Sequence, residues 1–209
     1  SKEPDLRLAP ASITKLMTAI LSLDNLELTE SFTISAAADA TPIGYVGQPD
    51  LRQGEVWIVR ALLANILVQS GNDAAVALAE AVAGNVEDFV VMMNAEAVEL
   101  GMTNTSFRNP NGLDDVEHLT TAHDLVTLGR AALGYPAALE IMRIKHISFN
   151  AAGRLIEVDA TNRDLGVFPG LFGLKTGDTV AAGQTMLSYT ETQHERIVAV
   201  VLGSTDRRA

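Results

Sequence analysis

The chain contains no cysteine, few aromatic residues and few basic residues. Without cysteine it can form no disulfide, no thiolate nucleophile and no Cys-ligated metal site. Only 15 of its 209 residues are Lys or Arg, against 26 Asp or Glu, so the formal net charge is −11. Because the few basic residues do not cluster, no surface suits a phosphate backbone and we expect no nucleic-acid partner.

Long apolar runs and metal-ligand patterns are missing as well. No run of 18 or more apolar residues occurs, so the sequence predicts attachment to a membrane only through segments absent from this chain. The histidines His118, His123, His146 and His194 lack metal-ligand spacing, and we expect neither a metal nor another cofactor. With 47% hydrophobic and 20% charged residues, the composition is that of an ordinary globular domain.

Hydrophobic periodicity predicts helices in the first two thirds of the chain and strands at its end, which is an α+β arrangement. The predicted helices start near Ser12, cover about 57–68, 73–83, 86–100 and 121–133, and resume after Pro136. The predicted strands form a hairpin, 146–150 and 154–159, followed by 172–176, 185–190 and 196–202. Residues 31–56 are predicted to be irregular. The last strand is almost entirely apolar, so we expect it in the centre of the sheet, buried on both faces.

Ser12 and Lys15 lie three residues apart at the start of the first predicted helix, so their side chains share one face. A serine hydroxyl needs a neighbouring base to become a nucleophile. A lysine can be that base if burial or a second cation lowers its pKa. The alternative interpretation, a helix-capping serine and a solvated lysine, fits poorly with the apolar residues around Lys15.

Ser70-Gly71-Asn72 separates two predicted helices. The serine hydroxyl can pass on a proton, and the asparagine amide can both donate and accept hydrogen bonds. Serine, glycine and asparagine are also common turn residues, so this motif alone indicates no more than an ordinary connection between helices.

Lys175-Thr176-Gly177 follows an apolar stretch at the end of a predicted strand. A cation and a hydroxyl at a strand edge can hold a carboxylate, and a glycine beside them allows close approach of a substrate backbone. Taken alone, this motif equally fits a strand that ends in a turn. The three motifs in this order, at a helix start, an interhelix loop and a strand end, are far harder to explain by chance.

With these motifs the chain resembles the serine-type D-Ala-D-Ala carboxypeptidases, the low-molecular-mass penicillin-binding proteins. The matching segments are Ala9–Ala19, Leu67–Glu80, Gly101–Phe107, Gly112–Asp114, Gly173–Thr179 and Ala199–Gly203. The resemblance implies a β-lactamase/transpeptidase-like fold, in which helices flank an antiparallel sheet and form a separate lobe. Residues 1–209 would be a single catalytic domain, apparently trimmed at both ends. The helical lobe, at about 31–140, would be inserted between the nucleophile helix and the C-terminal strands.

The resemblance also implies an activity outside the cytoplasm, either in the periplasm or on the outer face of the cytoplasmic membrane. The enzyme would remove the terminal D-alanine of peptidoglycan stem peptides through an acyl-enzyme on Ser12, and β-lactams would acylate the same serine. Lys15 would be the base and Ser70 the proton relay, and backbone N–H groups of Ser12 and Asp178 would form the oxyanion hole. The implied catalytic residues are Ser12, Lys15, Ser70 and Asn72, and the implied substrate-binding residues are Lys175, Thr176, Gly177 and Asp178.

Two alternatives remain open at this point. A class A-like β-lactamase or an esterase could share the fold, but the class A enzyme needs a Glu-x-x-Leu-Asn run, and none lies between Asn72 and Lys175. A non-catalytic penicillin-binding or cell-wall-binding module could keep the fold without activity, although all three motifs are intact.

Overall fold

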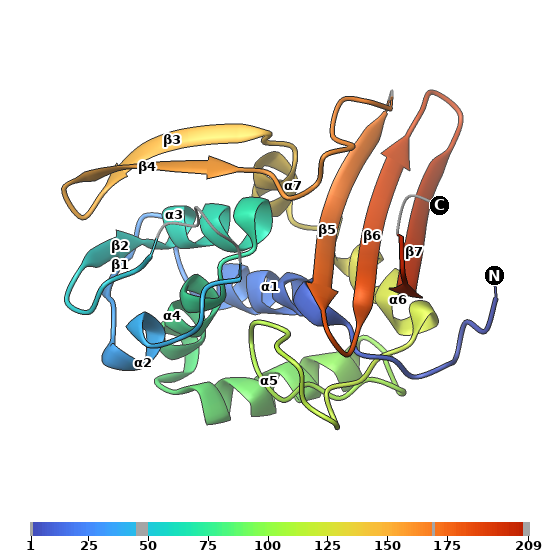
Figure 1. Ribbon diagram of the computed structural model, residues 1–209, viewed down its shortest axis with the longest axis horizontal. Coiled ribbons are helices and arrows are strands. Elements are labelled where there is room, and N and C mark those ends of the chain that lie inside the picture. The colour runs from blue at the N-terminus through green and yellow to red at the C-terminus, as the bar shows by residue number, and fades with distance from the viewer. Residues whose placement is uncertain (1, 45–49, 169, 207–209) are drawn as a thin grey trace.

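The computed structural model describes residues 2–44, 50–168 and 170–206. A helical part and a three-stranded sheet lie side by side (Figure 1). The helices are the 3₁₀ helix η1 (Ala11–Thr14), α1 (Lys15–Asn25), α2 (Ala36–Asp39), α3 (Val59–Ala64), the π-helix η2 (Asn65–Gln69), α4 (Asn72–Ala83), α5 (Val86–Glu99), α6 (Ala122–Ala132) and α7 (Pro136–Met142). The strands are β1 (Ser31–Thr33), β2 (Val56–Ile58), β3 (His146–Ala151), β4 (Arg154–Asp159), β5 (Leu171–Thr179), β6 (Gly183–Glu191) and β7 (Arg196–Ser204). The predicted α+β fold is confirmed.

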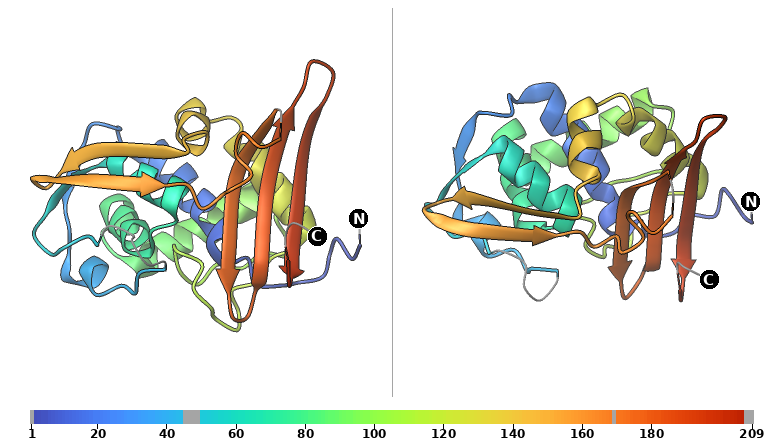
Figure 2. Two further views of the ribbon diagram at one scale, coloured as in Figure 1. Left: turned by 45° about the horizontal axis from the view of Figure 1, so that its top comes forward. Right: turned by 90° about the horizontal axis from the view of Figure 1, so that it is seen from above.

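Helix α1 runs through the middle of the molecule, and η1 at its N-terminal end meets strand β5 (Figures 1 and 2). The predicted helix start near Ser12 is confirmed, because η1 begins directly after Pro10 and continues into α1. Residues 15–22 of this helix are all buried. A helix that is covered on every side belongs to a protein core, so the nucleophile candidate stands at the end of a rigid element.

The helix predicted over about 57–68 begins at Val59, and its last turn is not α-helical. The first residues of the predicted range form β2, which pairs antiparallel with β1 inside the stretch predicted to be irregular. The last turn is the π-helix η2, and Ser70 ends it with a φ of +72°. π-Helical turns are rare and favour functional sites, and this one delivers the second motif. Glycines with a positive φ follow α4 and α5, Gly84 at +82° and Gly101 at +79°.

The hairpin β3–β4 crosses the helical part near η2 and β2, whereas β5, β6 and β7 form the separate antiparallel sheet (Figures 1 and 2). Helix α6 covers one face of this sheet, where Gly129 packs directly on Leu187 and Val198. The predicted central, fully buried position of residues 196–202 is wrong. Strand β7 is the outer strand of the described sheet, and the exposure of its residues alternates along the strand. The domain boundary 1–209 and the lobe at about 31–140 stay predictions.

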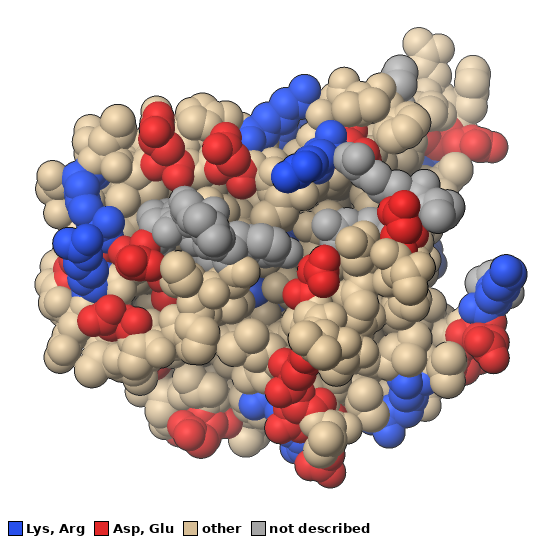
Figure 3. Space-filling model, in the orientation of Figure 1, with Lys and Arg blue, Asp and Glu red and all other residues tan. Residues whose placement is uncertain are grey.

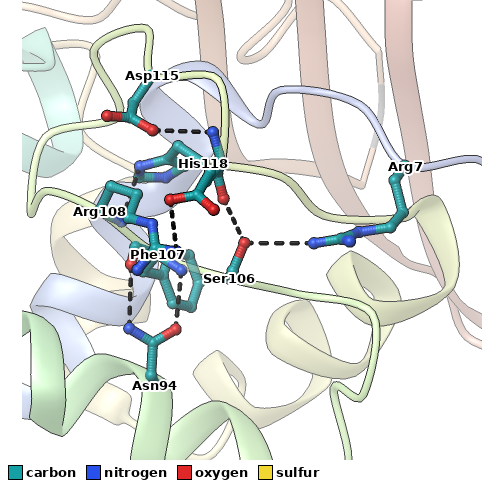
Figure 4. Close-up of polar contacts among 8 residues, drawn as sticks. Arg7, Asn94, Ser106, Phe107, Arg108, Asp115 and His118 are labelled. Carbon is teal, nitrogen blue, oxygen red and sulfur yellow. Dashed lines mark hydrogen bonds and ion pairs between the residues drawn. The ribbon is translucent and has the colours of Figure 1, made fainter.

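The loop between α5 and α6 is fixed by polar contacts on both of its sides (Figure 4). The Asn94 side chain accepts from the Phe107 N–H at 2.9 Å and donates to the Phe107 carbonyl at 3.0 Å. The Nδ1 atom of His118 accepts from the Arg108 N–H at 3.2 Å, and its Nε2 lies 2.9 Å from the Thr14 hydroxyl. This loop is thereby attached to the nucleophile helix.

Charged side chains of both signs are scattered over the face seen in Figure 3, without a continuous basic strip. Within residues 2–44, 50–168 and 170–206, no helix is both long enough and apolar enough to cross a bilayer. In the same residues, no three acidic or histidine side chains come together in a way that could hold a metal ion.

Candidate active site

The Lys15 side chain is completely buried and its Nζ atom has three close oxygen neighbours. These are Ser12 Oγ at 2.9 Å, Asn72 Oδ1 at 2.7 Å and the backbone oxygen of Asn111 at 2.6 Å. Ser12 itself is only part-buried. The first and second sequence motifs therefore meet at one lysine.

The amide of Asn72 has a defined orientation. Its Nδ2 atom donates to the Pro42 carbonyl at 2.9 Å, which leaves Oδ1 facing Lys15. Asn111 is not among the residues expected from the sequence; it lies in the run Asn109-Pro110-Asn111-Gly112, whose composition is typical of a turn. Its contribution is a backbone carbonyl, and a backbone carbonyl has no residue-type signature.

The pKa of Lys15 lies well below its usual value of 10.5. Burial is the main cause, because it disfavours the ammonium form; the positive charge of Lys175 lowers the pKa further, and Asp73 opposes both effects. Burial and a second cation, the two possible causes of a low lysine pKa, are both present here, and Lys175 of the third motif is that cation. The neutral amine of Lys15 is therefore easier to form than that of an exposed lysine.

The hydrogen-bond acceptors around Lys15 Nζ determine where the lone pair of the neutral amine points. A neutral amine has two N–H groups and one lone pair. The Oδ1 atom of Asn72 and the carbonyl of Asn111 can only accept, so they take the two N–H groups. The lone pair then faces the Ser12 hydroxyl 2.9 Å away. That distance is within the range in which a general base takes a proton.

Strand β5 runs directly against Ala11 and Ser12. A Cβ atom added at Gly177 would lie 2.8 Å from the Ser12 nitrogen and 2.8 Å from the Ala11 Cβ, so only glycine fits. Lys175 and Thr176 are 2% and 3% exposed, and the Lys175 ammonium donates to the Thr176 carbonyl at 2.9 Å. The third motif is thus beside the first, whereas the Asp178 side chain is exposed to solvent.

A second glycine also packs against the backbone at Ala11 and Ser12. Gly112 has a φ of +83°, and a Cβ there would lie 2.0 Å from the Ala11 oxygen and 3.0 Å from the Ser12 nitrogen. Ala11 has a φ of +50°, a left-handed conformation that costs a non-glycine residue about 1–2 kcal/mol. The backbone just before Ser12 is therefore strained, and two glycine backbones hold it there.

The Ser70 side chain makes fewer hydrogen bonds in the site than those of Ser12, Lys15 and Asn72 do. Its Oγ atom is buried, and it has no hydrogen-bond partner among the described residues. The residue has left-handed backbone geometry two positions before Asn72. Its predicted part in proton relay stays a prediction.

Over residues 1–206 the sequence matches the family described as D-alanyl-D-alanine carboxypeptidase, peptidase family S11. The chain belongs to this family. Among its relatives, D-alanyl-D-alanine carboxypeptidase DacF of Bacillus subtilis is 35% identical over 209 residues, which are 98% of this chain and 53% of DacF. The chain thus spans about half the length of the curated relatives it matches.

Solved structures agree with this assignment. The carboxypeptidase DacD of Francisella tularensis superimposes with a TM-score of 0.91 at 31% identity, over 99% of this chain and 62% of that one. Penicillin binding protein 6B of Escherichia coli gives a TM-score of 0.86 at 32% identity, over 97% of this chain and 66% of that one. The transpeptidase-like fold that the family resemblance implies is confirmed.

Proposed function

We propose that this chain is the catalytic domain of a serine D-Ala-D-Ala carboxypeptidase that trims peptidoglycan stem peptides. The observation that carries the proposal is the contact of Lys15 Nζ with Ser12 Oγ, because the other two oxygen neighbours direct the amine lone pair to that hydroxyl. Membership of the S11 family supports the choice of substrate. The protein works outside the cytoplasmic membrane, where that substrate is found.

The reaction has two steps. Ser12 Oγ attacks the carbonyl carbon of the penultimate D-alanine, while Lys15 takes the hydroxyl proton. The peptide bond breaks, a proton relayed through Ser70 goes to the leaving nitrogen, and the terminal D-alanine departs. Water then attacks the acyl-enzyme, the stem peptide leaves as a carboxylic acid, and Ser12 regains its proton. Asn72 holds the substrate amide during both steps.

The strand β5 provides the substrate-binding side. Lys175 and Thr176 bind the terminal carboxylate through charge-assisted hydrogen bonds. The backbone N–H groups of Ser12 and Asp178 stabilise the oxyanion, and the missing side chain at Gly177 keeps the backbones close enough for both to reach it. Removing one such donor typically slows an enzyme by about 10²–10³-fold. β-Lactams, which carry a carboxylate next to a reactive carbonyl, acylate Ser12 and inhibit the enzyme.

Intact-protein mass spectrometry after incubation with a penicillin tests the proposal. We expect one penicilloyl adduct on wild-type protein, mapped to Ser12 by peptide analysis, and none on a Ser12→Ala variant. We also expect release of D-alanine from an acylated dipeptide ending in D-Ala-D-Ala. A folded wild-type protein without the adduct would refute the proposal. Loss of the adduct within seconds would instead indicate a β-lactamase.

A further inference from the structure

The connection that follows β4 contacts both walls of the candidate site. The Thr161 N–H donates to the carbonyl of Val68 at 3.0 Å, two residues before Ser70. The Thr161 hydroxyl lies 2.8 Å from the hydroxyl of Thr176 on β5. One threonine outside the three motifs therefore joins the segment that carries the second motif to the strand that carries the third.

Thr161 is held in this place from several sides. The neighbouring Asn162 packs so closely on β5 that a Cβ at Gly173 would lie 1.7 Å from its Nδ2 atom, and its Oδ1 accepts from the Asp164 N–H at 3.0 Å. The pairing of β5 with β6 shifts by one residue between Gly173 and Lys175, which is a β-bulge. Bulges re-aim the side chains that follow them. The connection and the bulge together fix the spacing between the two hydroxyls.

When substrate is bound, the number of protons available decides which of the Thr161 and Thr176 hydroxyls donates to the other. A threonine hydroxyl has one proton to donate, and a carboxylate can only accept. Once Thr176 donates its proton to the substrate carboxylate, it can only accept from Thr161. The Thr161 hydroxyl must then be the donor, and hydrogen bonds in such a chain strengthen one another.

We propose that Thr161 is a positioning residue that orients the Thr176 hydroxyl toward the substrate carboxylate. The inference rests on the proposed function, in which Thr176 binds that carboxylate. Thr161 acts on binding and not on the chemical step, because the carboxylate is held equally before and during acyl transfer. Losing such an interaction raises KM and leaves kcat unchanged.

The test compares Thr161→Val, which keeps the shape and the backbone N–H but lacks the hydroxyl, with Thr161→Ser, which keeps the hydroxyl. Thr161→Ala is a second variant without the hydroxyl, in case valine disturbs folding. For release of D-alanine from a D-Ala-D-Ala peptide, we expect KM to rise about five-fold in T161V, the usual weight of one hydrogen bond, with kcat unchanged within about twofold. T161S should restore KM.

Two further measurements separate positioning from a structural role. In a Thr176→Val background, T161V should cause no additional rise in KM, because the hydroxyl that it orients is gone. With an acyl-D-alanyl ester that lacks a terminal carboxylate, T161V should match the wild-type kcat/KM.

Additive effects of T161V and T176V, an equal loss on the ester, or a wild-type KM in both T161V and T161A would each overturn the inference. In all of these outcomes the wild-type enzyme still releases D-alanine, so the proposed function stands. A wild-type protein that neither forms the penicilloyl adduct nor releases D-alanine refutes the proposed function, and the inference falls with it.

Discussion

His118 should make the protein lose stability in mild acid. Its side chain is 1% exposed, and its Nδ1 atom accepts a hydrogen bond from the Arg108 N–H. The other nitrogen, Nε2, must therefore carry the proton that is donated to the Thr14 hydroxyl at 2.9 Å, and the imidazole must be neutral. Burial is the main reason that the pKa of His118 falls from 6.5 to about 4, with Asp115 opposing and Arg108 assisting.

The size of the effect follows from linkage. Between pH 6.5 and about 4 the unfolded chain binds a proton at His118 that the folded chain does not bind, so the free energy of unfolding decreases as the pH falls. Each pKa unit corresponds to about 1.4 kcal/mol, and the whole shift to about 3 kcal/mol. Most of the loss is already present at pH 5, where the same relation gives about 2 kcal/mol less stability than at pH 7.

Urea unfolding at pH 7 and pH 5 measures this loss. His118→Gln is the informative variant, since its amide can still donate to Thr14 and accept from Arg108 but does not titrate. We expect H118Q to lose about 2 kcal/mol less than wild type between the two pH values. His194→Gln, which removes an exposed histidine, is the matched control. Equal losses in wild type and H118Q would show that His118 is not buried as a neutral donor.

Two further variants test the nucleophile and its base. Gly112→Ala places a Cβ 2.0 Å from the Ala11 oxygen, so we expect at least a tenfold slower acylation by penicillin; Gly153→Ala, which has a similar positive φ but open space around it, should acylate at the wild-type rate. An unaffected G112A rate would contradict the close packing. Lys175→Gln removes the second cation, so the pKa of Lys15 should rise and the pH–rate profile of acylation should move to higher pH. An unmoved profile would show that Lys175 does not influence the base.

The local sequence pattern was enough to predict most helices and strands of the fold. Helical periodicity found α4, α5 and α6 to within one or two residues, and the turn Ala151-Ala152-Gly153 separated the hairpin strands correctly. The position of 196–202 in the sheet was wrong for a physical reason. An apolar sequence indicates that the side chains of a strand favour burial. It does not indicate which neighbouring elements cover them, and therefore does not give the position of the strand in the sheet.

The candidate site was predictable as far as side chains define it. Ser12, Lys15 and Asn72 do meet. Gly112 lies in a segment that resembles the family, but nothing in the sequence marked the Asn111 carbonyl or the missing Cβ of Gly112 as part of the site. The Asn111 carbonyl oxygen and the missing Cβ of Gly112 matter because of where they lie, and the tertiary fold determines where they lie. Thr161 was missed for the same reason, since nothing in its sequence neighbourhood distinguishes it from an ordinary loop threonine.

The geometry at Ser12 also explains why a short motif cannot identify this site by itself. Ala11 adopts a left-handed conformation that its own sequence disfavours. Gly112 and Gly177 permit that conformation by bringing two backbones within contact of Ala11 and Ser12, and any side chain at either glycine would push them apart. The backbone position of Ser12 is thus set by residues 100 and 165 positions further along the chain, since 112 − 12 is 100 and 177 − 12 is 165. In the proposed mechanism, a serine and a lysine one turn apart act as nucleophile and base only because the rest of the fold brings these two glycine backbones against the serine.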